Sequence, residues 1–342
     1  MARKGRIRMI RQWMLSSVTV CVMTVTLLLC PSTALPQTDQ IVFLAFADGD
    51  DKIHVMNADG SHLHRVGMLP GHYGDARFST DNLKIVFRYF QLSEVTPQIY
   101  IMSTDGTNVR RLTEPPHAHG LLQIAPRGQI IYSHELNPGS STPPFTDTYI
   151  MNQDGSTKVP FRIVAPDIGA LGRDTSEFVL CPGRMAVFTK TNVGTYNSDH
   201  IYTMETARNE LRRLTSSIDS SRYLACSPDG KKIAYANVGA SGVMLQAHHD
   251  DDGIYIMNMD GTHARRIVQI NFGEELGPSD SVGIGPGRDI VQLTGPLSFN
   301  SDGSKLTYSV HLGRRNDQIY IVNTDGTELK RLANGTHPSF SR

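Results

Sequence analysis

Histidine is the residue type in this sequence with the widest chemical scope. The chain has 13 histidines among 342 residues, and imidazole is a common metal ligand that also binds anions when it is protonated. Most of them fall between β-rich segments, where loops would carry them. Eight are candidate ligand- or partner-binding residues: His72, His117, His119, His134, His248, His249, His311 and His337. Two interpretations stay open: these histidines form a binding site for a metal or an anionic ligand, or they are loop residues that bind nothing, because polar loops also collect histidines.

Other catalytic patterns are weak. No Gly-x-Ser-x-Gly motif of a serine hydrolase occurs, and the glycine-rich run GIGPGRD from Gly283 lacks the lysine of a phosphate-binding loop. The 33 basic and 33 acidic side chains cancel, which argues against a nucleic-acid partner. We therefore predict no cofactor and assign no residue as catalytic or as a metal ligand.

The first 34 residues are typical of a secretory signal peptide. A basic stretch ends at Arg11, an apolar run covers residues 13–30, and the small residues Ser32 and Ala34 follow at peptidase spacing. We expect cleavage after Ala34 and a periplasmic or secreted protein. The segment takes five basic residues with it, which leaves 28 basic against 33 acidic side chains, a net charge of −5. The alternative is a retained membrane anchor, since 18 residues are the lower limit for a span.

Two cysteines remain after the predicted cleavage. Cys181 and Cys226 fall at similar places in consecutive repeats. Either they form a single bridge between neighbouring strands or they are small buried side chains.

A repeated phrase organises the rest of the chain. Its form is IYIMSTDGTNVRRLT, and six copies are marked by a tyrosine or its equivalent at His54, Tyr100, Tyr149, Tyr202, Tyr255 and Tyr320. The spacings are 46, 49, 53, 53 and 65 residues, which are the lengths of four-stranded propeller blades. An insertion between Asn271 and Gly295 explains the longest one. Either RRIVQI or RDIVQLT could be the fourth strand of that blade.

A second phrase, such as LACSPDGKKIAY from Leu224, alternates with the first. Each phrase is a hairpin, so every repeat supplies four antiparallel strands. The final HPSFSR is an inner strand without a partner, and QIVFLAF from Gln40 is a second strand without its first. The sequence therefore predicts an all-β fold: a six-bladed β-propeller over residues 35–342, closed by pairing of its N- and C-terminal strands.

Most repeated polar residues have a structural explanation. The Asp-Gly turns that begin at Asp59, Asp105, Asp154, Asp260 and Asp325 require glycine at positive φ. The basic pairs that begin at Arg110, Arg212, Arg265 and Lys330 fall on the outermost strand, where charge discourages edge pairing. We expect Asp51, Asp199, Asp252 and Asp317, three residues before the marker, to cap strand starts, with ligand binding as the second possibility.

The phrases IYxMNxDGxxxRRLT and SPDGxKIAY resemble the propeller repeats of TolB and TolB-like proteins. TolB carries an α/β domain ahead of its propeller, and this sequence leaves no room for one between the signal and the first strand. The resemblance therefore implies a stand-alone, non-enzymatic, monomeric scaffold. Its loop-rich face and channel mouth would bind an envelope or extracellular protein, or a polysaccharide. The alternative is a metal-dependent enzyme acting on acidic polysaccharide, because oligogalacturonate lyases are related propellers that use a histidine-bound metal.

Overall fold

The computed structural model describes residues 39–342 except 48, 95, 136–145, 162–163, 166–168, 171–174, 193–197, 209, 216–219, 239–250, 271–291 and 313–315. The predicted signal peptide over residues 1–34, with its alternative as an anchor, lies outside the described residues. All described residues belong to one compact unit, Thr38–Arg342. Within them, no helix is long and apolar enough to cross a membrane.

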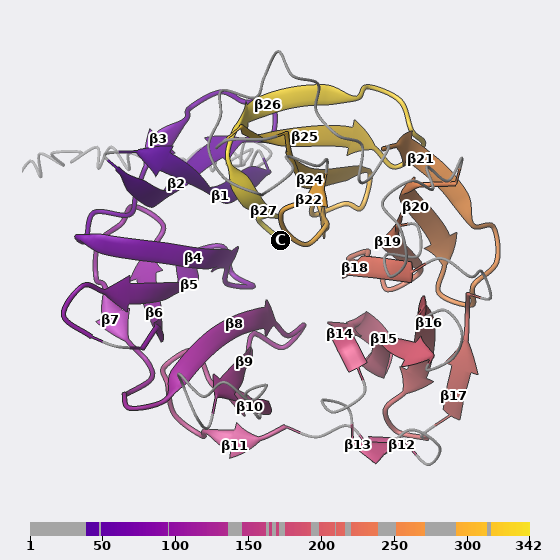
Figure 1. The fold of residues 1–342 in the computed structure, drawn as a ribbon, viewed down its shortest axis with the longest axis horizontal. Coiled ribbons are helices and arrows are strands. Elements are labelled where there is room, and N and C mark those ends of the chain that lie inside the picture. Colours follow the sequence, from indigo (N-terminus) through magenta and orange to yellow (C-terminus); the bar gives the residue numbers. More distant parts are fainter. Residues whose placement is uncertain are drawn as a thin grey trace, which may run out of the picture. The chain divides into compact units, whose positions relative to one another are not determined.

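The described chain forms six antiparallel blades arranged as a ring (Figure 1). Blade 1 comprises β27 (Thr336–Phe340), β1 (Gln40–Ala47), β2 (Asp50–Asn57) and β3 (His64–Arg65). Blade 2 comprises β4 (Gly71–Phe78), β5 (Lys84–Gln91), β6 (Gln98–Ser103) and β7 (Arg110–Arg111). Blade 3 comprises β8 (Ala118–Ile124), β9 (Ile130–Glu135), β10 (Thr146–Met151) and β11 (Val159–Pro160). The six-bladed, four-stranded prediction is confirmed.

The other three blades repeat this order. Blade 4 comprises β14 (Thr175–Cys181), β15 (Met185–Asn192), β16 (Ser198–Glu205) and β17 (Glu210–Arg213). Blade 5 comprises β18 (Ser220–Cys226), β19 (Lys232–Val238), β20 (Gly253–Asn258) and β21 (Arg265–Gln269). Blade 6 has two short inner strands, β22 (Gln292–Leu293) and β23 (Ser298–Phe299), followed by β24 (Lys305–His311), β25 (Asp317–Asn323) and β26 (Lys330–Asn334).

Some short elements lie outside the blade pattern, and the two candidate fourth strands fall in different blades. The strands β12 (Val164–Ala165) and β13 (Gly169–Ala170) pair with each other between blades 3 and 4, and a 3-10 turn, η1 (Pro182–Arg184), joins β14 to β15. Of the two candidate fourth strands, RRIVQI forms β21 in blade 5, whereas RDIVQLT contributes β22 to blade 6.

The closing blade joins the two ends of the unit. In blade 1 the first strand, β27, pairs with β1, so that Ile41 lies opposite Phe340. Beyond this ladder, the backbone N–H of Gln40 donates to Oγ of Ser341, and the N–H of Ser341 donates back to the carbonyl of Gln40, both at 2.8 Å. These bonds satisfy strand edges that would otherwise be free.

An aromatic pair lies at the same register in every blade. The ring of the marker residue in the third strand packs against the ring directly opposite it in the second strand, with ring centroids 5.5–5.8 Å apart. The six pairs are Phe43–His54, Phe87–Tyr100, Tyr132–Tyr149, Phe188–Tyr202, Tyr235–Tyr255 and Tyr308–Tyr320. Directly opposite residues share one face of an antiparallel sheet. The repeated marker therefore packs within its own blade.

The strand directions define two faces of the propeller. One side carries the turns between first and second strands and between third and fourth strands, and we call it the turn face. The other side carries the blade-to-blade connections and the loops between second and third strands, and we call it the loop face. The glycines of the Asp-Gly turns have φ of 79–91°, as predicted, and each aspartate accepts the N–H of the residue two positions later.

Candidate functional site

The inner strands of all six blades surround a central cavity of about 570 Å³. In every blade, the residue before the last apolar residue of the inner strand lines this cavity: Arg77, Gln123, Leu180, Ala225, Ser298 and Ser339. The lining extends to the turn residues Thr80, Pro126, Pro182, Pro228 and Ser301 and to Arg342. The cavity therefore occupies the turn-face half of the channel.

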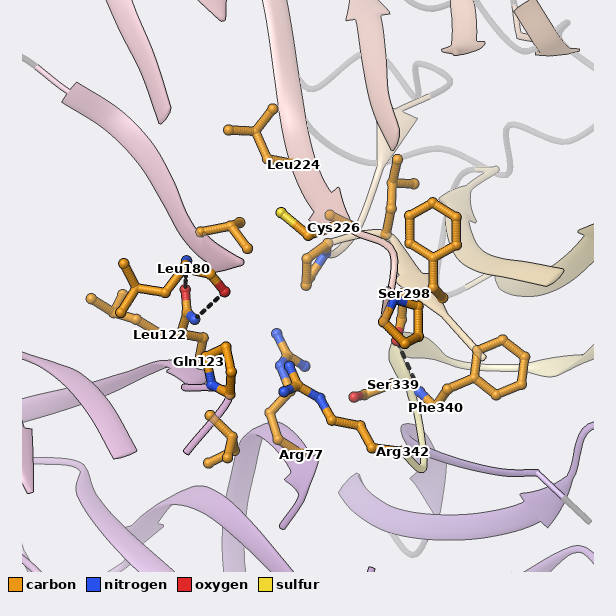
Figure 2. Close-up of a pocket in the computed structure, with 18 of the residues that line it drawn as sticks. Arg77, Leu122, Gln123, Leu180, Leu224, Cys226, Ser298, Ser339, Phe340 and Arg342 are labelled. Atoms are coloured by element: carbon orange, nitrogen blue, oxygen red, sulfur yellow. Dashed lines mark hydrogen bonds between the residues drawn. The ribbon is translucent and has the colours of Figure 1, made fainter. Parts of the chain in front are cut away.

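Arg77 and Arg342 project into this cavity from β4 and from the end of the chain (Figure 2). Burial lowers the pKa of the Arg77 guanidinium, and burial together with the charge of Arg77 lowers the pKa of Arg342. Nη1 of Arg77 donates to the carbonyl of Ala76 at 3.1 Å. Asn82, in the turn of the neighbouring blade, accepts the backbone N–H of Arg342 at 2.7 Å and so holds that residue in place.

Polar side chains tie neighbouring inner strands together along the wall. Gln123 on β8 accepts the N–H of Leu180 on β14 at 2.9 Å and donates to its carbonyl at 3.4 Å. Oγ of Ser298 on β23 accepts the N–H of Phe340 on β27 at 3.0 Å (Figure 2). These bonds fix the walls of the cavity across blade boundaries.

Glu177 on β14 makes a similar contact with blade 5. Its carboxylate accepts the backbone N–H groups of Tyr223 and Leu224 at 2.6 and 2.7 Å. The register of β18 against β19 shifts between Arg222 and Ala225, and Tyr223 has a φ of 60°. The bulge turns these two N–H groups away from the ladder. Burial outweighs both hydrogen bonds and raises the pKa of Glu177 to about 7.

Cys181 and Cys226, at the ends of β14 and β18, form a disulfide. Their Cα atoms are 5.7 Å apart, which is within the range that a bridge requires. Of the two possibilities left open by the sequence, the structure has the bridge between neighbouring inner strands.

The loop face carries three histidine–aspartate pairs on adjacent blades 6, 1 and 2. Nδ1 of His72 lies 2.6 Å from Asp50, Nδ1 of His311 lies 2.7 Å from Asp317, and Nε2 of His337 lies 3.8 Å from Asp75. Asp317 thus pairs with His311 across the β24–β25 hairpin, and Asp199 pairs with Arg222 of the next blade at 3.0 Å. Burial, together with the charges of Asp50 and Asp317, raises the pKa of Asp51.

Two glycines make room for this cluster. A Cβ at Gly295 would lie 2.8 Å from Cα of His337 and 3.2 Å from its ring. A Cβ at Gly74 would lie 2.7 Å from Nε of Arg88, whose guanidinium is 3.7 Å from Asp75. Both distances are below van der Waals contact, so no other side chain fits without displacement.

A second group of histidines lies on blade 3. The ring of His134 is 4.4 Å from that of His117 and 4.8 Å from that of His119, between centroids. Burial and the neighbouring His134 lower the pKa of His119 to about 4. Buried ring nitrogens of all three lack a hydrogen-bond partner. Even so, among the described residues no three His, Cys, Asp or Glu side chains are placed to hold a metal ion.

The structure thus divides the eight predicted histidines. His72, His119 and His337 are the second residues of the inner strands β4, β8 and β27. His72 and His337 share the loop-face cluster of blades 1 and 2, and His311 lies in blade 6. His117, His119 and His134 form the blade 3 group. His248 and His249 lie outside the described residues. None of the described six lines the 570 Å³ cavity.

Sequence reasoning missed Arg77, Arg342 and Glu177. A signal for Arg77 does exist: in the aligned second phrases, the equivalent residues are Gln, Leu, Ala and Ser, so arginine stands out as a charge facing the channel. Glu177 carries no such signal, because its partners are backbone groups of another blade.

Exposed apolar side chains lie on the loop face of blades 1 and 2, the face that also carries His72. Met68 is 71% exposed, Leu92 68% and Phe46 47%. They belong to the connections before β4, after β5 and at the end of β1. A hollow of about 200 Å³ is lined in part by His72, Arg88, Phe90 and Pro97. We call Phe46, Met68, His72 and Leu92 the loop-face patch.

No family model and no curated protein matches the sequence. Solved structures do match the fold. TolB from Acinetobacter baumannii superposes with a TM-score of 0.61 at 16% identity, and the match covers 88% of this chain and 66% of that one, less than two thirds. A protein assigned as TolB from Agrobacterium tumefaciens gives a TM-score of 0.56 at 15% identity, covering 88% and 92%.

The chain has a TolB-like propeller fold. At these identities the likeness describes the fold alone. An oligogalacturonate lyase in complex with manganese superposes with a TM-score of 0.49 at 11% identity, covering 86% of this chain and 74% of that one. That similarity carries no argument about activity.

Proposed function

We propose that the protein is an exported binding scaffold that engages an envelope or extracellular protein through the loop face of its TolB-like propeller. Export is supported by the signal-peptide pattern of residues 1–34. A binding role is supported by the fold, whose solved examples include TolB.

One observation carries the proposal: the loop-face patch exposes apolar side chains beside charged ones. His72 is 58% exposed on its side chain and remains within hydrogen-bond reach of Asp50. Its ring centroid lies 6.0 Å from that of Phe90, and both side chains line the 200 Å³ hollow. Large apolar side chains rimmed by polar groups are typical of protein–protein interaction sites.

The patch favours a protein over a polysaccharide partner. Met68 and Leu92 are aliphatic chains that gain from desolvation against another apolar surface, whereas sugar polymers offer hydroxyl groups. The metal-dependent enzyme is not proposed, because the described histidines separate into a blade 3 group and a cluster on blades 6, 1 and 2.

Affinity capture with matched variants tests the proposal. The mature chain is immobilised and exposed to an envelope extract of the source organism, and retained proteins are quantified. The Met68→Asp/Leu92→Asp double variant should lose the bound protein, whereas Leu63→Asp/Leu329→Asp, which alters exposed leucines of the turn face, should retain it. Equal retention by both double variants would contradict the loop face as the docking site, and recovery of polysaccharide alone would contradict a protein partner.

A further inference from the structure

The central cavity contains two cations, and among the described residues no side-chain carboxylate is paired with either of them. In the described part of the chain, no acidic side chain lies within 4.0 Å of the guanidinium of Arg77 or of Arg342. Asp75 acts on Arg77 only through its charge at longer range. Glu177 lines the same cavity, but both of its oxygens are engaged by backbone N–H groups.

Arg77 is half-buried and Arg342 is more exposed, and their like charges repel each other. The charge of Arg77 acts on Arg342, and the two groups project into the same space (Figure 2). An oxyanion between them would remove this repulsion and accept charge-assisted hydrogen bonds, because the guanidinium fork matches the geometry of carboxylate and phosphate.

The remaining wall is mostly apolar. Leu122, Leu180, Leu224 and Phe340 line it together with the hydroxyl groups of Ser298 and Ser339 (Figure 2). A volume of about 570 Å³ lies within the range of small-molecule sites. The wall therefore suits a ligand with an apolar body and one anionic end.

We propose that the turn-face half of the channel binds a small organic anion, with its carboxylate or phosphate on Arg77 and Arg342 and its apolar body against the leucine and phenylalanine wall. This site is separate from the loop-face patch and does not depend on the proposed docking of a protein there. The two arginines act as a binding pair, and no bond is made or broken.

Calorimetric titration of the mature chain with four probes tests the site. Octanoate and octyl phosphate carry the two anionic groups on one apolar chain, octanol carries the chain without charge, and inorganic phosphate carries the charge without the chain. Octanoate or octyl phosphate should bind saturably, at least about tenfold more tightly than octanol and than inorganic phosphate. The tighter of the two identifies the anionic group.

Variants separate the site from nonspecific attraction. Arg77→Gln and Arg342→Gln should each weaken the preferred probe by about tenfold or more, whereas Lys231→Gln, which removes an exposed cation on a turn, should leave its affinity unchanged. Circular dichroism and the melting temperature show whether each variant is folded. The proposal is overturned if neither charged probe binds the wild type at millimolar concentration, if octanol binds as tightly as octanoate and octyl phosphate, or if folded Arg77→Gln and Arg342→Gln proteins bind like the wild type.

Discussion

The carboxylate of Glu177 accepts the backbone N–H of Leu224 at 2.7 Å and so joins blade 4 to blade 5 beside the central cavity. The same carboxylate holds the N–H of Tyr223, which the bulge in β18 has released from its ladder. A buried acid at a blade boundary makes folding sensitive to pH.

Stability should fall between pH 4.5 and about 7 through this group. Burial raises the pKa of Glu177 from 4.5 to about 7 in the folded protein, so the folded state favours the protonated acid. Its contribution is complete below pH 4.5 and is lost as the pH rises through about 7. The full shift corresponds to about 3 kcal/mol, reduced by solvent in the channel. Melting temperatures of wild type and Glu177→Gln at pH 5 to 8 should diverge with pH, whereas those of wild type and Glu205→Gln should not. Parallel curves for wild type and Glu177→Gln would refute this role.

The aromatic pair within each blade predicts that two substitutions of Tyr308 will lower the unfolding free energy by different amounts. Its ring is 2% exposed and stacks on Tyr320 at 5.5 Å. Tyr308→Ala should cost about 3–5 kcal/mol of unfolding free energy, because it leaves a cavity in the blade. Tyr308→Phe keeps the ring and should stay within about 1 kcal/mol. Urea denaturation measures both values, and similar losses in the two variants would show that the hydroxyl, not the stack, matters.

The disulfide should stabilise the ring. Cys181 and Cys226 are 45 positions apart in the sequence, and closing a loop of that length restricts the unfolded chain by roughly 4 kcal/mol. A Cys181→Ala/Cys226→Ala double variant should therefore unfold at lower denaturant concentration than the oxidised wild type and at a concentration close to that of the reduced wild type. Coincident curves for oxidised and reduced wild type would contradict the effect.

Removal of the signal can be read from fluorescence. The chain has one tryptophan, Trp13, within the segment that we expect to be cleaved after Ala34. The exported protein should therefore begin at Leu35 and show no indole emission on excitation at wavelengths that tyrosine does not absorb. Mass spectrometry gives the new N-terminus directly. Indole emission from purified exported protein would indicate a retained segment.

The fold could be predicted from the sequence because propeller blades are local units. Each phrase carries its own strand pattern and most carry a turn glycine, and the orphan strands ending at Phe340 and beginning at Gln40 identify the closing blade. The contacts between neighbouring blades could not be predicted from the sequence in the same way. His337 meets Asp75 across the boundary between blades 1 and 2, and Glu177 binds N–H groups exposed by a bulge at Tyr223. These contacts depend on how whole blades pack. The aspartates at 199 and 317, expected as strand caps, pair across blades or hairpins for the same reason.

Site-specific photocrosslinking tests the binding-scaffold account most directly. A photoreactive amino acid is placed at Met68, at Leu92 or, as a control, at Leu329 on the turn face, and the exported protein is irradiated in the intact envelope. The account predicts one discrete crosslinked protein from positions 68 and 92 and none from position 329. The absence of any crosslink at 68 and 92, or equal crosslinking at 329, would contradict it.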